Sequence, residues 1–168
     1  MWTEEELKRV ADITEKNNLW IISDEIHCDL IRKGNRHIPT GKIMPDYNKL
    51  ITCMSASKTF NMAGLMFSNI IIRNETLRER FCARDKNVGF VNPLSIAAHK
   101  AAYEKCYDWL EQLQEYLDGN FQFLDNYLKE FLPKAVFEIP EATYLAWVDM
   151  HAYLSDVEDL PAFFANEA

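Results

Sequence analysis

The apolar and polar positions of the first 74 residues predict one helix followed by short strands. Behind a T-x-x-E capping box at Thr3, apolar side chains recur every three or four residues, so we expect an amphipathic helix over residues 4–17. Short apolar runs, which predict strands, follow at 19–23, 50–55 and 68–74. A continuous apolar run directly after a helix is typical of a strand buried on both faces of a parallel sheet, and we expect this of residues 19–23.

Loop and helix signals surround these strands. Residues 32–48 contain glycine, prolines and charged side chains and are expected to form a loop. After residue 74 the apolar spacing becomes helical, and the longest of the expected helices carries leucine and phenylalanine at steps of three and four. We expect these helices over residues 76–86, 93–106 and 107–131.

The end of the chain predicts two strands and one more helix. The strands are expected at 135–139 and 143–150, and the helix within 155–167. Phe163 and Phe164 on that helix have no downstream residues to cover them. We therefore expect the sequence to be a piece of a larger protein.

Taken in order, these elements predict an α/β fold class. The first 74 residues alternate helix and strand, and the remainder is richer in helix. A boundary at the start of the long helix divides the chain into residues 1–106 and 107–168. At 168 residues, the chain is long enough to bury a sizeable core.

Charge and cysteine content exclude several function classes. A formal net charge of -8 is unfavourable for binding nucleic acid or an anionic membrane, because both need a cationic surface. No segment approaches the about 20 apolar residues of a membrane-spanning helix, and the acidic N-terminus is unlike a signal peptide. The four cysteines form no C-x-x-C pair, which favours reduced thiols in a cytoplasmic protein.

Two groups of polar residues follow predicted strands. Asp24 comes at the carboxyl end of the first strand, where α/β proteins bind ligands, although it could equally cap the next turn. Ser55, Ser57 and Lys58 follow the second strand. A solvated loop is the simpler interpretation of this serine-rich turn. The S-x-x-K pattern of serine acyltransferases also matches Ser55 and Lys58, but its S-D-N and K-T-G partners are missing.

The histidines give no metal-site signal of their own. His27, Cys28 and His37 are close in sequence, but their spacing matches no common metal-binding template. Histidines that are hydrogen-bonded or exposed are the better interpretation, and we expect no metal.

Three motifs together resemble one family. The segments SDEIHCDL (23–30), SASKTFNMAGLMFSNIIIRN (55–74) and TYLAWVD (143–149) are similar to fold-type I pyridoxal-phosphate enzymes of the class I/II aminotransferase superfamily. Within it they resemble the cystathionine β-lyase/cystalysin-like C–S lyase group of the MalY/PatB type. The resemblance implies part of a pyridoxal-phosphate-binding large domain, with a mostly parallel sheet and helices, over residues 1–106. Residues 107–168 are then the interdomain helix and the start of an α+β small domain.

The resemblance also assigns roles around a pyridoxal 5'-phosphate cofactor. Lys58 matches the lysine that forms a Schiff base with the cofactor aldehyde, and Asp24 matches the carboxylate that pairs with the pyridine nitrogen. His27 occupies the position that faces the phenolic oxygen, and Ile26 is expected to pack on one face of the ring. Ser55 and Ser57 match hydroxyls near the phosphate.

The implied reaction requires a neutral Lys58, so burial and a cationic neighbour are expected to lower the pKa of its amine. Lys58 then takes the Cα proton of an amino-acid substrate. Loss of a thiolate from Cβ leads to pyruvate and ammonia, whereas an aminotransferase reprotonates the cofactor carbon. A sulfur-containing substrate is therefore expected for a lyase.

The sequence departs from the family in two ways. Met66 stands where many aminotransferases carry a phosphate-binding arginine. The family's Asn-Pro-x-Gly segment, glycine turn and ring-stacking aromatic would precede Met1, and the substrate-carboxylate arginine would follow Ala168. The resemblance thus implies a truncated chain, weakly active or inactive, from a homodimeric parent. The alternatives are an aminotransferase, a non-enzymatic fragment, and a subunit that needs a complementary half.

Overall fold

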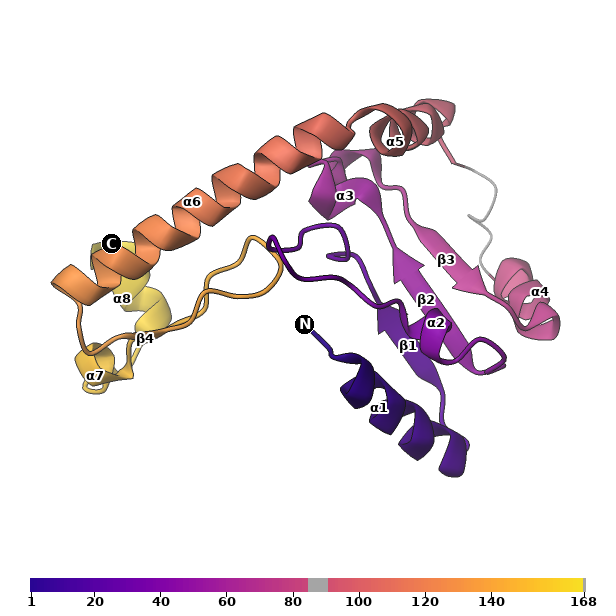
Figure 1. Ribbon diagram of the computed structural model, residues 1–168, viewed down its shortest axis with the longest axis horizontal. Helices are drawn as coiled ribbons and strands as arrows, with labels where there is room; N and C mark the ends of the chain where they lie inside the picture. The colour runs from indigo at the N-terminus through magenta and orange to yellow at the C-terminus, as the bar shows by residue number, and fades with distance from the viewer. Residues whose placement is uncertain (85–90, 168) are drawn as a thin grey trace.

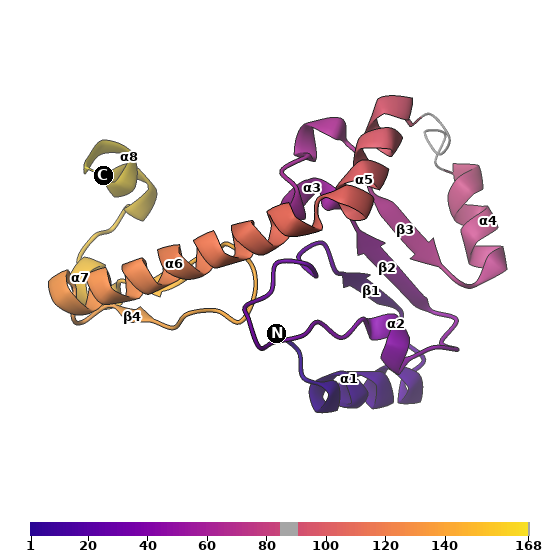
Figure 2. The same cartoon turned by 45° about the horizontal axis from the view of Figure 1, so that its top comes forward.

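The computed structural model describes residues 1–84 and 91–167, which form an α/β unit with a long helical arm (Figure 1). Figure 2 shows that the arm projects away from the sheet and that the chain then returns toward it. The α/β fold class expected from the sequence is confirmed. The described elements are α1 (Glu4–Lys16), β1 (Ile21–Asp24), α2 (Thr40–Ile43), β2 (Leu50–Met54), α3 (Ala56–Thr59), η1 (Ala63–Leu65), β3 (Asn69–Ile72), α4 (Glu75–Arg84), α5 (Pro93–Lys105), α6 (Tyr107–Phe131), β4 (Val136–Phe137), β5 (Val148–Asp149), α7 (His151–Leu154) and α8 (Leu160–Glu167).

The sheet has the order β1-β2-β3, and its register aligns two strand ends that carry candidate site residues. Strands β1 and β2 run parallel, with Ile21 opposite Leu50 and Asp24 opposite Cys53. Strand β3 joins β2 antiparallel. Because parallel strands end at the same edge, Asp24 and the segment that begins at Ser55 emerge together.

Burial of β1 differs from the sequence prediction. The expected strand over 19–23 is shifted to Ile21–Asp24, and it is not buried on both faces, since 71% of Ile22 is exposed. Along β1 the side chains alternate between half-buried and exposed, because α1 and α2 cover only one face among the described residues. Residues 50–55 and 68–74 form strands as expected, with slightly tighter bounds.

The predicted helices at either end of the α/β unit are confirmed. The hydroxyl of Thr3 accepts a hydrogen bond from the Glu6 amide while the Glu6 carboxylate accepts one from the Thr3 amide, which completes the capping box of α1. Helix α6 has the bounds predicted for it and buries Phe121 and Leu128. The chain from Glu75 to Arg84 is helical, and residues 85–86 of that predicted helix lie outside the described residues.

One predicted loop and one predicted strand differ from the structure, and the last predicted helix is confirmed with a later start. The expected loop 32–48 contains helix α2. Residues 143–150 form a strand only at Val148–Asp149. The start of this run lies instead beside the α/β unit, because the neighbouring Ala142 makes an isolated bridge to Ile31. The helix expected within 155–167 begins only at Leu160, after a separate short helix α7.

Within the described residues, no helix has the length and apolar character needed to cross a membrane.

The buried core is small for the length of the chain. Among the described residues, ten apolar side chains are buried, on the sheet and on the helices that pack around it or on α6: Leu7, Ala11, Leu30, Met44, Leu50, Ala56, Ile72, Ala102, Phe121 and Leu128.

Candidate functional site

Asp24 lies at the end of β1 with an exposed carboxylate. Its Oδ1 accepts a hydrogen bond from the Ile26 amide at 3.2 Å, so the turn-capping role considered from the sequence is present. No hydrogen bond from a described residue engages its Oδ2. The carboxylate can therefore cap its turn and still accept one more donor. Ile26 itself is half-buried.

His27 is half-buried and contacts a segment more than 100 residues away in sequence. Its Nδ1 lies 3.3 Å from the hydroxyl of Thr143. The ring of Tyr144 lies 5.6 Å from the His27 ring, centroid to centroid. The 143–149 motif is thus brought to the 23–30 motif by the fold.

Ser55 caps the short helix α3, and Ser57 lies in the first turn of that helix. The Ser55 hydroxyl donates to the carbonyl of Phe67 at 2.6 Å and accepts from the Ser57 amide at 3.0 Å. The two serine hydroxyls also lie 2.7 Å apart. Because the Ser55 proton is already used, Ser57 is the donor between them. Ser55 is therefore a structural cap, and its hydroxyl is bonded to Phe67 and Ser57 rather than to Lys58, which gives no support to the serine acyltransferase alternative.

Lys58 stands on α3 with its side chain exposed. Its amine makes no hydrogen bond or ion pair with the residues of 1–84 and 91–167. The burial expected of Lys58 is therefore not supplied by the described residues.

Asp29 anchors α3 to the rest of the fold, a role that sequence reasoning missed. The hydroxyls of Thr59 and Tyr103 both donate to Asp29 Oδ2 at 3.0 Å. The Gln114 side chain donates to the Asp29 carbonyl at 2.8 Å. Burial, followed by the Asp29 charge, raises the pKa of the Tyr103 hydroxyl, so Tyr103 stays a donor. Helices α3 and α5 thus meet at the Asp29 carboxylate, and α6 is bonded to the backbone carbonyl of the same residue.

We expect Thr59→Val to lower the free energy of unfolding by about 1–2 kcal/mol, because Thr59 is 0% exposed and would lose its bond to a charged acceptor while keeping its shape. Chemical denaturation followed by circular dichroism measures the change. Thr76→Val on the exposed face of α4 is the matched control and should change stability by less than about 0.5 kcal/mol. Equal effects of the two variants would contradict the anchoring role of Asp29.

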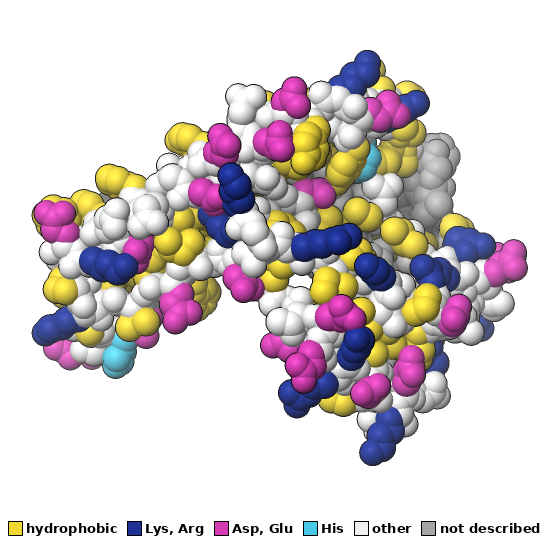
Figure 3. Space-filling view, viewed as in Figure 1, with side chains coloured by type: hydrophobic (Ala, Val, Ile, Leu, Met, Phe, Trp, Pro, Cys, Tyr) yellow, Lys and Arg dark blue, Asp and Glu magenta, His cyan; other side chains and the backbone are white. Residues whose placement is uncertain are grey.

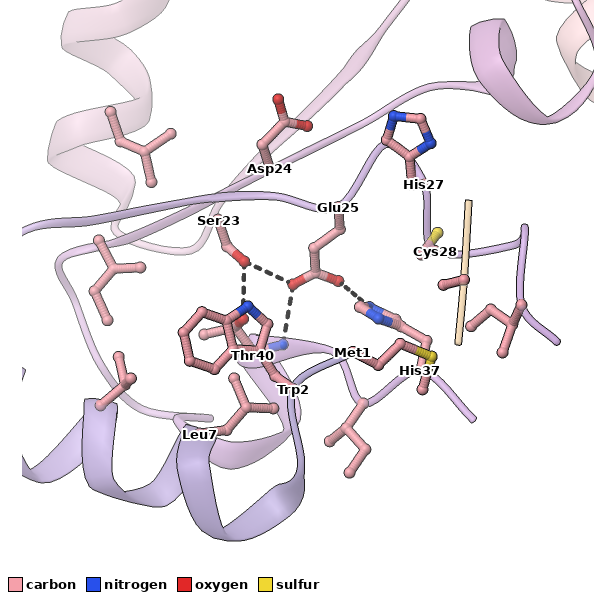
Figure 4. Close-up of a pocket in the computed structure, with 16 residues that line it drawn as sticks. Met1, Trp2, Leu7, Ser23, Asp24, Glu25, His27, Cys28, His37 and Thr40 are labelled. Atoms are coloured by element: carbon pink, nitrogen blue, oxygen red, sulfur yellow. Dashed lines mark hydrogen bonds and ion pairs between the residues drawn. The ribbon is translucent and has the colours of Figure 1, made fainter. Parts of the chain in front are cut away.

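Glu25 is the centre of a second buried network (Figure 4). Its carboxylate accepts hydrogen bonds from the Ser23 hydroxyl and the Thr40 amide, each at 3.0 Å, and lies 2.8 Å from His37 Nε2. Glu25 is only 9% exposed. Burial raises the pKa of Glu25, but the bonds from His37, Thr40 and Ser23 together outweigh it, and the net pKa lies below the usual value. The network ties the 37–40 segment to the end of β1.

Cys28 and His37 do not form the metal site that their spacing could suggest. His37 pairs with Glu25. Burial, together with the charge of Asp29, raises the pKa of the Cys28 thiol to about 12, so Cys28 is a protonated thiol at neutral pH. Within the ranges that the structure describes, no three His, Cys, Asp or Glu side chains converge as a metal site requires.

The candidate residues line two different hollows. Asp24 and His27 border an open pocket of about 380 Å³ between β1, α1 and the 37–40 segment. Ser55 and Ser57 border a small crevice beneath η1 and α5 that has no room for a water molecule. The shared strand edge brings these groups to one side of the sheet, but these two hollows do not join them into one pocket.

Sequence reasoning missed the supporting residues because each acts through a distant partner. Asp29 lies inside the 23–30 motif, where other polar and charged residues surround it and nothing local marks it. Arg32 lies in the segment expected to form a loop, yet its side chain is 10% exposed and pairs with Asp118 of α6. Partners 30 or more residues away leave no local signal in the chain.

Comparisons with known proteins agree on one family. The family described as aminotransferase class I and II matches residues 1–164. Cystathionine beta-lyase PatB of Bacillus subtilis is 37% identical over 161 residues, which is 94% of this chain and 42% of PatB. Protein MalY of Escherichia coli is 35% identical over 153 residues, which is 89% of this chain and 39% of MalY.

Solved structures give the same result. The PLP-bound C-S lyase from Staphylococcus hominis superposes with a TM-score of 0.93 and is 51% identical; the match covers 98% of this chain and 43% of that enzyme. The chain therefore spans about two-fifths of the length of the relatives it matches.

Proposed function

Because the chain belongs to the class I and II aminotransferase family, we propose that it is part of a pyridoxal 5'-phosphate-dependent C–S β-lyase. The lyase reaction is supported by the similar proteins, which include a cystathionine beta-lyase and a C-S lyase. A sulfur-containing amino acid is the proposed substrate, with pyruvate, ammonia and a thiol as products. The observation that carries the proposal is the parallel register of β1 and β2, which brings Asp24 and Lys58 to one edge of the sheet.

The described side chains fit the ring end of this cofactor. The exposed Asp24 carboxylate has an oxygen left to accept from a protonated ring nitrogen. The exposed Lys58 amine is accessible to an aldehyde. At the phosphate end, Ser57 is the better candidate. Ser55 is buried and its proton is bonded to the Phe67 carbonyl, whereas Ser57 is half-buried and its proton, which is given to Ser55, can turn to a phosphate oxygen.

Each residue then has a proposed task. When bound, the cofactor supplies an electron-withdrawing ring that stabilises negative charge at the substrate Cα. Asp24 keeps the ring nitrogen protonated, and His27 donates to the phenolic oxygen. Ile26 packs against the ring. Lys58 holds the cofactor and afterwards accepts the Cα proton at Nζ, which requires a neutral amine and hence a cover that the described residues do not supply.

The proposed organisation follows the family. Residues 1–106 are assigned to the second half of the large domain and residues 107–168 to the interdomain helix and the start of the small domain. The end of α5 at Lys105 and the start of α6 at Tyr107 support this boundary. The four cysteines are free thiols, which supports the proposed cytoplasmic location.

Exposed apolar side chains support the proposal that this chain binds a partner chain. Figure 3 shows hydrophobic side chains at the surface both over the α/β unit and along the arm. Ile22 is 71%, Leu94 73% and Trp147 88% exposed. We propose that these positions are covered in a homodimer of the parent protein or by a complementary half, since exposed apolar patches mark interaction surfaces.

Borohydride trapping tests cofactor binding. The chain is mixed with pyridoxal 5'-phosphate, reduced and digested, and the added mass is located. We expect the label at Lys58, its complete loss from that peptide in Lys58→Ala, and a weaker label in Asp24→Asn. Lys100→Ala is the matched control, because Lys100 is an exposed helical lysine on α5. A label scattered over surface lysines would refute the proposed site.

Product analysis separates the proposed lyase from the aminotransferase alternative, which the family description favours. Release of a thiol and pyruvate from a cysteine conjugate identifies a lyase, whereas exchange of amino and keto acids identifies an aminotransferase. A chain that takes the label but turns over neither substrate would support a non-enzymatic fragment or one subunit of a split enzyme.

A further inference from the structure

The segment 141–144 is held against the end of the 23–30 motif by backbone contacts. Ala142 bridges Ile31, and the Thr143 amide donates to the Leu30 carbonyl at 2.6 Å. The Arg32 amide donates in turn to the Glu141 carbonyl at 2.9 Å. These bonds join a segment that follows the helical arm to a loop of the α/β unit.

Thr143 adopts a backbone conformation that its side chain disfavours. Its φ is +71°, in the left-handed region that β-branched residues rarely occupy. The carbonyl of Thr143 accepts from Arg32 Nη2 at 2.9 Å, which holds the peptide in place. Such strain persists only where the surroundings over-determine it, and it gathers at functional sites. Here it directs the Thr143 hydroxyl to His27 Nδ1.

We propose that Thr143 is a positioning residue that fixes the orientation and tautomer of His27. The inference rests on the proposed function, in which His27 donates to a phenolic oxygen. That task needs the proton on Nε2, so Nδ1 must be the acceptor. The Thr143 hydroxyl is 3.3 Å from Nδ1 and supplies the donor, while the Tyr144 ring, 5.6 Å from the imidazole, limits its rotation.

Two variants separate the effect of the Thr143 hydroxyl from the effect of its backbone conformation. Thr143→Val keeps the β-branched shape and therefore the same backbone cost, but it removes the donor. Thr143→Ser keeps the donor. Tyr144→Phe keeps the ring beside His27 and serves as a control for general disturbance of the segment.

The first measurement is the nitrogen spectrum of the histidine rings in the cofactor-free chain at alkaline pH, where neutral imidazoles are observed. We expect His27 to show a hydrogen-bonded, unprotonated Nδ1 and a protonated Nε2. In Thr143→Val the hydrogen-bond signature at Nδ1 is expected to disappear and both tautomers to be populated, with the wild-type pattern kept in Thr143→Ser and Tyr144→Phe. The His37 signals, which report a ring paired with Glu25, should stay unchanged in all variants.

A protonated Nδ1 in the wild-type chain, or an unchanged His27 spectrum in Thr143→Val, would overturn the proposal. The second measurement is borohydride labelling at Lys58, expected to weaken in Thr143→Val and to be restored in Thr143→Ser. If the spectrum responds as expected but the wild-type chain takes no label, Thr143 still positions His27 and the proposed function fails. If the label forms at Lys58 but the His27 spectrum does not change in Thr143→Val, the proposed function stands and this inference is refuted.

Discussion

Arg32→Met is expected to lower the free energy of unfolding by about 2–3 kcal/mol, the largest effect among the substitutions considered. Arg32 Nη1 lies 2.9 Å from Asp118 Oδ1 of α6, and Nη2 donates to the Thr143 carbonyl. The guanidinium carbon also lies 4.3 Å from the centroid of the Phe121 ring. Methionine fills similar volume but leaves Asp118 without its cation.

The expected loss is below that of a fully buried pair, because the Asp118 side chain is 38% exposed and partly screened by water. The approach of Nη1 to Oδ1 is off the hydrogen-bonding direction, so the pair is Coulombic in character. Urea unfolding measures the total effect. Hydrogen exchange at the Thr143 amide should also accelerate, because the 141–144 segment loses its bond to Arg32.

Lys129→Met is the matched control for Arg32→Met. Lys129 and Asp125 form an ion pair at 2.6 Å one turn apart on α6, and the Lys129 side chain is 73% exposed. Exposed helical pairs contribute about 0.3–0.5 kcal/mol, so this variant should lose no more than that. If Arg32→Met lost as little as Lys129→Met, Arg32 would be a surface residue of no structural importance.

Glu25→Gln is expected to lower the free energy of unfolding by about 2 kcal/mol at pH 7. The amide keeps the size of the carboxylate but replaces a charged acceptor of three hydrogen bonds with a neutral one. The partners Ser23, Thr40 and His37 then lose their charge-assisted bonds. Denaturation at neutral pH measures the difference between the variant and the wild type.

The pH dependence has a definite sign. The folded pKa of Glu25 is below its ordinary value of 4.5, so the folded state binds fewer protons there than the unfolded state. The stabilisation is fully present above pH about 4.5 and is lost as the pH falls from there through the folded pKa. The two proteins should therefore become more alike in stability in acid.

Glu138→Gln, which changes an exposed carboxylate, is the control and should leave the unfolding midpoint unchanged at both pH values. A stability difference for Glu25→Gln that stayed constant from pH 7 into acid would show that its charge does not stabilise the fold.

Local sequence signals were sufficient for much of the fold. The capping box at Thr3 and the helical spacing of 107–131 gave elements with nearly the observed bounds, because caps and amphipathic spacing act within a few residues. The prediction of a strand over 143–150 was wrong because it, too, rested on a local pattern. The alternation of apolar and polar side chains is local, whereas the bridge from Ala142 to Ile31 joins residues that are far apart in the sequence.

By itself the sequence determined the α/β class, the family motifs and the identity of Lys58, Asp24 and His27 as candidates, because these depend on residue type and order. Only the tertiary structure decided how those residues are held. The contacts of Asp29 with Tyr103, of Arg32 with Asp118 and of His27 with Thr143 each join residues 74 or more positions apart. Such contacts depend on the folded path of the chain, and the local pattern of side chains does not encode them.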